Sequence, residues 1–337
     1  MNKSTPPHRH ANAATAKVNT NKVNTNKVNT NKVNKSKVNK SKVNKSKVNT
    51  AKQRHLFRHA TLFVIWAWLV IFALLPNMIV IIASFLTRDE GHFLAMPATL
   101  ANYARLIDPL YLKVFLHSLS MASITTLICL LLGYPFAWLV SKAKKRWQTL
   151  LMLLLIIPFW TNSLVRLYAV KLIVAANGLL SSALIGLGII NEPLQILYTQ
   201  SAVIGGLVYL LFPFMVLPLY AVFTDLPKDF ILASQDLGAN RLQTFWHVIL
   251  PLTTPGIISG VLLVLLPAMG MFYVADILGG SRNLLVGNVI KSQFLDARDW
   301  PFGAAASVLL TLAMAVLILA YRISSKRIGK TDYNEVA

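Results

Sequence analysis

Charged residues are scarce in this chain, and cysteine is almost absent. Only 13% of the 337 residues are Asp, Glu, Lys or Arg, 55% are hydrophobic, and there is one cysteine. A soluble protein of this length has too little interior to bury so many apolar side chains. The single thiol, Cys129, excludes a disulfide framework, and its place inside an apolar run suits a small apolar side chain. The composition therefore indicates a multi-span membrane protein.

Acidic residues are missing from the first 58 residues. This segment holds 15 of the 33 Lys and Arg but none of the 12 Asp and Glu, so the rest of the chain carries only 18 minus 12, or +6. Within it the triplet Lys-Val-Asn recurs every five residues from Lys17 to Lys47, a period that fits neither helix nor strand. We expect residues 1–58 to be a disordered cytoplasmic tail that is attracted to anionic membrane lipid. No aromatic residue precedes Phe57, and no nucleic-acid partner is expected.

Long apolar runs make up most of the remaining sequence. A helix needs about 20 apolar residues to cross a bilayer, and six runs approach or exceed that length. We therefore expect an all-α integral membrane protein with six transmembrane helices. The predicted spans are Leu62–Leu86, Val114–Val140, Leu150–Ile173, Ala202–Phe223, Pro251–Leu278 and Ala304–Tyr321.

The basic residues between the spans predict how the chain is oriented. The tail, Lys142–Arg146 and Arg322–Lys330 fall on one side of a six-span arrangement, whereas the other loops have balanced charges. Cytoplasmic loops carry the excess of Lys and Arg, so both termini should be cytoplasmic. Thr224–Leu250 then also lies in the cytoplasm.

The cytoplasmic segment around residues 225–250 reads as a helical hairpin. Phe230, Ile231 and Leu237 give one apolar helical face, and Gly238 with Asn240 can end that helix. A second apolar face follows at Leu242, Phe245, Trp246 and Ile249, and Pro251 suits the first turn of the next helix. Physical reasoning alone leaves two interpretations open, a docking element for a cytosolic partner or a hairpin that covers the span ends.

The stretch "ASQDLGANRLQTFWHVILP", which starts at Ala233, resembles the cytoplasmic loop by which ABC-importer permeases engage their ATPase. The family pattern is Glu-Ala-Ala, three residues and Gly, then about nine residues and Ile-x-Leu-Pro. Leu232 stands in place of the glutamate, so a salt bridge from this position to the ATPase is not supported. By this resemblance the ATPase-coupling residues are Ala233, Ser234, Asp236, Gly238 and Ala239.

Longer strings extend the resemblance over about residues 60–325, to the permeases of spermidine/putrescine ABC importers. They are "LPNMIVIIASFLTRD", "DPLYLKVFLHSL", "LGYPFAWLVSK", "PFWTNSLVRLYA" and "FYVADILGGSRNLLVGNVIKSQFLDARDWPFGAA". The resemblance implies a six-span type I permease domain over residues 59–325, a cytoplasmic C-terminal tail over 326–337, and a place in a bacterial inner membrane. It also implies a second polyamine permease subunit, a dimer of a cytosolic ATPase and a periplasmic polyamine-binding protein.

The chain itself shows no catalytic or metal-binding constellation. Gly329-Lys330-Thr331 ends like a phosphate-binding loop, but Ser324 stands where the first glycine belongs. The histidine pairs in the tail have no carboxylate or thiol nearby, and we expect no metal site. We expect a transport subunit rather than an enzyme, with no cofactor of its own and with ATP and Mg on the partner ATPase.

A path for polyamines needs carboxylates for charge and aromatic faces for cation–π contacts. One candidate is "FYVADILGG", in which Phe272, Tyr273 and Asp276 lie within about one helical turn near the outer end of the fifth span. The other is "PFWTNSLVRLYA", in which Pro158 predicts a kink and the candidate residues are Phe159, Trp160, Asn162 and Tyr168.

Structural interpretations of the same residues also stay open. Trp160, Tyr168 and Tyr273 are equally suited to the aromatic belt at the membrane surface. Asp276 could pair with Arg282 or cap a helix. Arg166 is expected to bond a carboxylate or helix carbonyls, and Asp108 and Glu192 to be surface residues.

Two other functions fit the composition. An ABC permease for an anion or amino acid is separated from a polyamine permease only by the long strings above. A stand-alone channel or ion-coupled carrier is less well supported, because such carriers often have repeats and the 233–251 hairpin has no second copy.

Overall fold

The structure is a computed structural model that describes residues 59, 61–88, 95–280 and 283–334, without the side chains of Lys228 and of residues 320–334. The predicted tail, 1–58, lies outside the described residues. The chain divides into two units, Met1–Asn77 and Met78–Ala337. Throughout the described ranges the regular elements are helical, apart from one bridge between Thr87 and Ala95. The all-α prediction is confirmed.

Most of the helices follow one another with short connections, and the longer ones precede α3 and α8. Residues 61–69 are helical and lead into η1 (Val70–Leu74) and α2 (Leu75–Ser84). The elements after the first loop are α3 (Ala101–Leu106), α4 (Pro109–Lys142), α5 (Lys145–Ile156), η2 (Ile157–Trp160), α6 (Ser163–Val174), α7 (Leu179–Gly186), α8 (Gln200–Asp225), α9 (Lys228–Asp236), α10 (Arg241–Thr244), η3 (Phe245–Ile249), α11 (Leu250–Gly270), α12 (Phe272–Val274), η4 (Ala275–Gly279), α13 (Val286–Leu295) and α14 (Trp300–Asn334).

Six helical segments of the described chain are long and apolar enough to cross a membrane, as predicted. They are Thr61–Ser84, Pro109–Lys142, Ser163–Gly186, Gln200–Asp225, Arg241–Gly270 and Trp300–Leu319. The first, second, fourth and sixth overlap the predicted spans closely. The third and the fifth do not, because the chain leaves regular helical geometry inside each of the predicted runs.

The predicted third span, Leu150–Ile173, is interrupted near its middle. α5 ends at Ile156, a 3₁₀ turn follows over Ile157–Trp160, and α6 starts at Ser163. Pro158 cannot donate a backbone hydrogen bond, and the Asn162 side chain accepts one from the amide of Leu164 at 2.8 Å. A missing donor followed by a strong N-cap therefore starts a new helix. The kink predicted at Pro158 is a complete break.

The helix at the predicted fifth span, Pro251–Leu278, begins before the predicted first residue and ends before the predicted last residue. α11 ends at Gly270, where Met271 has φ −75° and ψ 65°, outside the helical region. At the other end the helix is continuous from Arg241, through the wide π turn η3. Pro251 lacks an amide, and the amide of Leu250 bonds five residues back to Phe245, which fits a π turn ahead of a proline. The second arm of the predicted hairpin thus forms one continuous helix with the fifth span.

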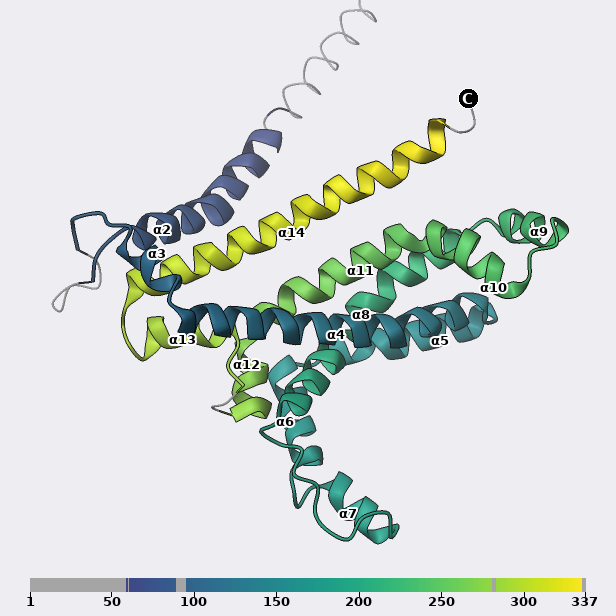
Figure 1. Ribbon diagram of the computed structural model, residues 1–337, viewed down its shortest axis with the longest axis horizontal. Coiled ribbons are helices and arrows are strands. Elements are labelled where there is room, and N and C mark those ends of the chain that lie inside the picture. Colours follow the sequence, from purple (N-terminus) through teal and green to yellow (C-terminus); the bar gives the residue numbers. More distant parts are fainter. Residues whose placement is uncertain (1–58, 60, 89–94, 281–282, 335–337) are drawn as a thin grey trace, which may run out of the picture. The chain divides into compact units, whose positions relative to one another are not determined.

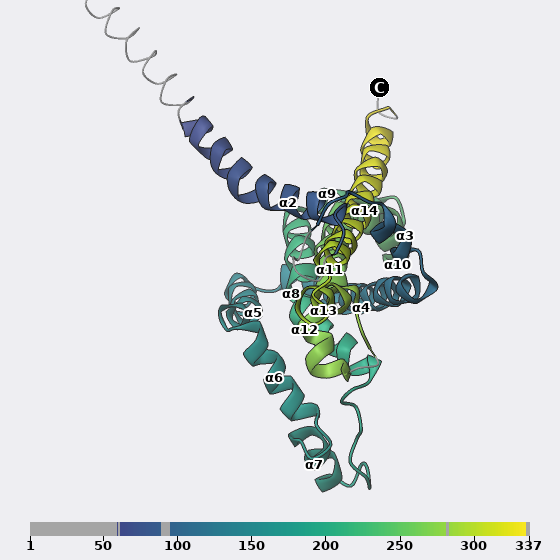
Figure 2. The ribbon, with the colours of Figure 1, turned by 90° about the vertical axis from the view of Figure 1, so that its left-hand side faces the viewer.

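α4, α8 and α11 form the core of the second unit and lie side by side in both views (Figures 1 and 2). Gly256 and Gly260, four residues apart on α11, let it approach α8 closely. A Cβ at Gly256 would lie 3.1 Å from the carbonyl oxygen of Pro218, and one at Gly260 would lie 2.6 Å from Sδ of Met215. Small residues at this spacing are a common means of packing helices inside membranes.

α9 and α10 lie at one end of this bundle, and α12 and α13 lie toward the other (Figure 1). α6 and α7 lead away from it in both views (Figures 1 and 2). A smaller core near the start of α14 is built from Leu106, Phe302, Ala305 and Ala306. Asp299, only 3% exposed, forms an ion pair with Arg105 at 2.9 Å and so ties α3 to α14, a pairing that the balanced charges of its own loop did not predict.

Candidate functional site

The first predicted cluster is compact in the structure. Phe272 and Tyr273 lie in α12 and Asp276 lies in η4, directly after the break at Met271. Val274, Ala275, Ile277 and Leu278 turn into the core, which leaves Phe272 and Asp276 on the exposed side. The rings of Phe272 and Tyr273 meet edge to face, with their centroids 6.1 Å apart. A carboxylate and two aromatic rings therefore share one short helical segment, as predicted.

Two residues of α13 complete this cluster, and no pattern in the sequence indicated either of them. Nζ of Lys291 lies 2.7 Å from Oδ2 of Asp276 and 5.6 Å from the centroid of the Phe272 ring. Asn288 donates to Oδ1 of Asp276 and, at 3.1 Å, to the carbonyl oxygen of Phe272. The carboxylate, the ring and the ammonium form what we call the ammonium site: Phe272, Tyr273, Asp276, Asn288 and Lys291.

Asp276 forms an ion pair within the described part of the chain. Its ion-pair partner is Lys291, and the carboxylate side chain remains 35% exposed. Arg282, the partner considered from the sequence, lies outside the described residues. The Asp276 carboxylate accepts a hydrogen bond from Lys291 and thereby raises the pKa of that ammonium. Lys291 is therefore a charged partner at physiological pH.

The four residues of the second predicted cluster lie in different environments. Phe159 lines a cavity of about 340 Å³ together with Arg166 and Tyr209, and its ring meets that of Phe214 at 5.1 Å. Trp160, which is 86% exposed, and Tyr168, which is 54% exposed, do not line this cavity. Asn162 is the N-cap of α6. Of the four predicted residues, only Phe159 lines this cavity.

Arg166 contradicts the prediction that it would bond a carboxylate or helix carbonyls. Among the described residues it makes no hydrogen bond or ion pair, and its buried Nε lacks a partner. Its guanidinium lies over two rings instead, 5.2 Å from the centroid of Phe159 and 5.9 Å from that of Tyr209. No hydrogen bond, ion pair or ring contact joins this cluster to the ammonium site within the described chain. Asp108 caps α4 through the amide of Leu110, and Glu192 is exposed.

The predicted hairpin has a well-defined turn. Gly238 has a φ of +82°, its amide donates to the carbonyl of Gln235, and the amide of Ala239 donates to that of Ser234. This is the Schellman arrangement that ends helices at a glycine. Asn240 and Gln243 then form a capping box, each side chain accepting from the backbone amide of the other.

One predicted coupling residue holds the two arms together, and the others are accessible. Oγ of Ser234 lies 3.0 Å from Oγ1 of Thr244, and both residues are buried. Ala233, Asp236 and Gly238 are exposed, and Ala239 is half-buried. The predicted apolar faces are only partly covered, because Ile249 is buried whereas Phe230, Leu237, Leu242 and Trp246 are exposed. An exposed apolar surface on this hairpin fits a docking element better than a cover for the span ends.

Comparison with known proteins decides the family. Residues 130–330 match the family described as binding-protein-dependent transport system inner membrane component. The chain belongs to this family. It is 56% identical over 263 residues to the spermidine/putrescine transport system permease protein PotB of Escherichia coli strain K12, covering 78% of this chain and 96% of that protein. It is 54% identical over 279 residues to PotB of Salmonella typhimurium strain SL1344, covering 83% and 97%.

A solved structure supports the fold. The chain is similar to a chain in the crystal structure of a bacterial alginate ABC transporter in complex with an alginate pentasaccharide-bound periplasmic protein. The TM-score is 0.68 at 14% identity, covering 82% of this chain and 96% of that chain. At this identity the similarity concerns the fold alone, and it confirms the predicted ABC permease fold. The protein is a multi-pass inner-membrane transport permease, as predicted.

Proposed function

We propose that this chain is the permease subunit of an ATP-driven ABC importer that moves spermidine or putrescine across the bacterial inner membrane into the cytoplasm. The observation that carries the proposal is the 54–56% identity to PotB proteins over 96–97% of their length. An identity this high over nearly the whole length of these permeases supports a shared class of transported substrate.

The ammonium site has the chemistry that a polyamine requires. A polyamine presents ammonium groups that are separated by methylenes, so its path needs a negative charge beside an apolar or aromatic face. Asp276 and Phe272 provide both, and the Lys291 ammonium already occupies the space between them. We assign Phe272, Tyr273 and Asp276 to the substrate path, in which a substrate ammonium exchanges with that of Lys291.

The second cluster contributes in a different way. Phe159 and Arg166, from either side of the break between α5 and α6, line one cavity, and the Arg166 guanidinium lies over the Phe159 ring. We retain Phe159, Trp160, Asn162 and Tyr168 as path residues in the assembled transporter, where a second polyamine permease subunit would cover the exposed side chains of Trp160 and Tyr168.

The hairpin is the proposed contact with a cytosolic ATPase dimer, which binds ATP and Mg in place of this chain. Because its second arm is continuous with the fifth span as far as Gly270, a movement of the hairpin reaches the residue before Met271 and the ammonium site. This orientation places both termini in the cytoplasm. A periplasmic polyamine-binding protein then delivers substrate on the opposite side.

Uptake of labelled spermidine and putrescine tests the proposal. Cells that lack this gene, with the neighbouring transport genes intact and no redundant polyamine importer, should lose polyamine uptake and regain it when the chain is restored. Amino-acid and phosphate uptake should not change. Polyamine uptake that is indifferent to the chain would exclude the substrate assignment.

The Asp276→Asn variant tests whether Asp276 acts in transport rather than in the stability of the fold. The variant keeps the size of the side chain but loses the charge, so we expect uptake to fall at least about tenfold, equivalent to about 1.4 kcal/mol, with normal assembly. Asp296→Asn is the matched control, because Asp296 is also exposed near α13 and attracts Lys291 only at longer range, without an ion pair. Equal uptake by the two variants would remove Asp276 from the path.

A further inference from the structure

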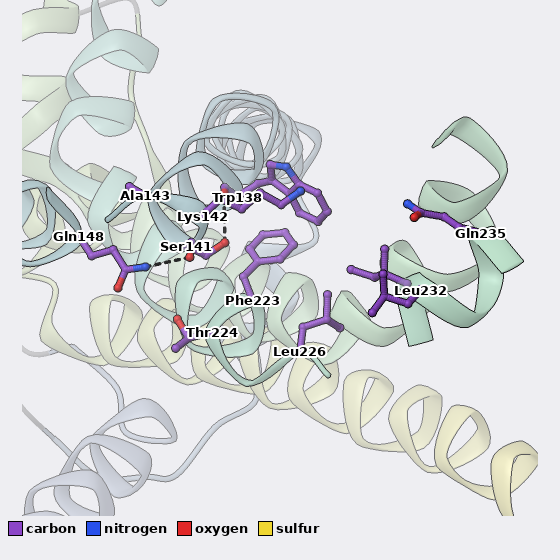
Figure 3. A pocket seen from close by; sticks show the side chains of 11 residues that line it. Trp138, Ser141, Lys142, Ala143, Gln148, Phe223, Thr224, Leu226, Leu232 and Gln235 are labelled. Carbon is purple, nitrogen blue, oxygen red and sulfur yellow. Dashed lines mark hydrogen bonds between the residues drawn. The ribbon is translucent and has the colours of Figure 1, made fainter. Parts of the chain in front are cut away.

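A large cavity lies at the hairpin end of the bundle, apart from the ammonium site. Its volume is about 730 Å³, and it opens between the end of α4, the start of α5, the end of α8 and α9 (Figure 3). Trp138 and Lys142 lie on one side of it, and Leu232 and Gln235 on α9 lie on the other. Gln148 fixes its rim by donating to the carbonyl oxygen of Ser141 at 2.8 Å.

A second cavity, of about 430 Å³, adjoins the first. It shares Trp138, Lys142, Ile231 and Gln235 with it and adds Arg241 from the start of α10. We call the two together the basic hollow. Its lining contains two cations and no carboxylate.

Both cations are available for an anion. Neither Lys142 nor Arg241 forms an ion pair with another described residue, and the Lys142 ammonium lies 3.8 Å from the centroid of the Trp138 ring. Two like charges that line one cavity repel each other, and an anion between them would remove that repulsion. Phosphate groups are suited to this role, since they accept several charge-assisted hydrogen bonds at once.

The remaining lining indicates the source of that phosphate. Phe223, Leu226, Ile231 and Leu232 give the hollow an apolar wall opposite its polar rim. It lies where the spans Pro109–Lys142 and Gln200–Asp225 end, the level at which headgroups and interfacial tryptophans are found. A free phosphate or an acidic side chain of a partner protein would leave the apolar wall unused. The glycerol and upper acyl carbons of a lipid would cover it.

We propose that the basic hollow binds the headgroup of an anionic phospholipid, with its phosphate between Lys142 and Arg241. Basic pockets between membrane helices are known to hold such headgroups. A lipid in this place bridges α4 to α10 and so connects the hairpin to the core independently of the transported solute.

Leu232 provides the sharpest test, since it lines the hollow from α9 and is 56% exposed. Leu232→Glu would put a carboxylate opposite the two cations, whereas Leu232→Gln would introduce a side chain of the same size without charge. The transporter complex would be purified from cells, exchanged into detergent, and its retained phosphatidylglycerol counted by native mass spectrometry. We expect Leu232→Glu to lose one retained lipid per copy of this chain and Leu232→Gln to keep it.

Charge-removing variants give an independent measurement. Lys142→Gln and Arg241→Gln should each lower phosphatidylglycerol retention about fivefold, from about 1 kcal/mol per cation. Lys144→Gln and Arg146→Gln remove equal charge from exposed residues that do not line the hollow, and should change nothing. Equal losses in all four variants would mean diffuse surface attraction and would overturn the site.

A free anion or an acidic side chain of a partner in the basic hollow would give different results in these experiments. If inorganic phosphate displaced the retained lipid fully, or bound the lipid-free complex with the same dependence on Lys142, a free anion would be the ligand. If Lys142→Gln released the ATPase while the lipid count stayed constant, an acidic partner side chain would fill the hollow. Either result overturns the lipid assignment, and neither depends on which solute is transported.

Discussion

At the scale of single residues, the most informative contact is the one between Lys291 and Asp276. The ammonium is held by a carboxylate at 2.7 Å and faces the Phe272 ring at 5.6 Å, which is the environment proposed for the substrate. A raised pKa for Lys291 means that the ion pair is complete below the ordinary lysine pKa and is lost only as the pH rises through the raised value. Physiological changes in pH should therefore leave it intact.

Lys291→Gln removes this intramolecular competitor. If a substrate ammonium exchanges with that of Lys291, the variant should take up putrescine with a lower KM. The decrease should be at most about fivefold, because exposed ion pairs contribute up to about 1 kcal/mol. Lys113→Gln, an exposed lysine of α4 outside the site, is the control. Initial uptake rates across substrate concentrations check this, and an unchanged or higher KM in Lys291→Gln would contradict exchange.

Gly287 is required where α13 meets the end of α11. A Cβ at this position would lie 2.6 Å from the carbonyl oxygen of Gly270, a backbone atom that cannot rotate away. Gly287→Ala should shift the neighbouring Asn288 off Asp276 and destabilise the fold by about 1–3 kcal/mol. Gly205→Ala, a helical position with open space around it, should be neutral or slightly stabilising. Thermal unfolding of the purified proteins measures both effects, and equal melting temperatures would refute the close-contact argument.

At the scale of elements, the hairpin turn depends on one backbone conformation. A Cβ at Gly238 would meet no atom within 4 Å, so a substitution there acts through the φ of +82° alone. Gly238→Val should open the turn and uncouple ATP hydrolysis from uptake, whereas Gly238→Asn should preserve coupling because asparagine tolerates left-handed geometry. The ratio of ATP hydrolysed to polyamine imported measures coupling. A normal ratio in the valine variant would count against the docking hairpin.

Sequence patterns predicted the membrane spans better than the places where the helices break. Apolar length sufficed to find six spans, because bilayer thickness sets the length of a spanning helix. The break after α5 depends on the Asn162 cap, and the end of α11 depends on the conformation of Met271, neither of which changes hydropathy. Pro158 indicated the first break in the sequence. Pro267 and Gly270 precede the second break, but prolines also lie within the continuous parts of α8 and α11, so these residues did not locate it.

The candidate site shows the same division between local and distant contacts. Phe272, Tyr273 and Asp276 could be predicted together because helical spacing alone brings them close. Their partners Asn288 and Lys291 lie 12 and 15 residues beyond Asp276 on another helix, and only tertiary packing selects them. Arg166 was predicted to find an acceptor, but an aromatic environment replaces one. Residue type therefore indicated the chemistry, and packing determined the partners.

At the scale of the whole molecule, orientation across the membrane decides what the two ends can do. Cys129 is buried and is the only cysteine of the chain, so a Cys129→Ala background gives clean single-cysteine variants. Lys144, between α4 and α5, and Glu192, between α7 and α8, are both exposed. In intact cells a membrane-impermeant maleimide should label Glu192→Cys and leave Lys144→Cys unlabelled until the inner membrane is disrupted.

The opposite labelling pattern would separate the two halves of the functional argument. The hairpin and the basic hollow would then face the periplasm, where no ATP is available, and the assignment of Ala233, Ser234 and Gly238 to ATPase coupling would fail. The ammonium site would be unaffected, because a carboxylate beside an aromatic ring attracts a polyamine from either side. The expected pattern instead places the hairpin beside the ATPase and the ammonium site toward the periplasmic side. That arrangement is what an importer needs, since ATP-driven closure at the hairpin can act on a rod that ends at the substrate.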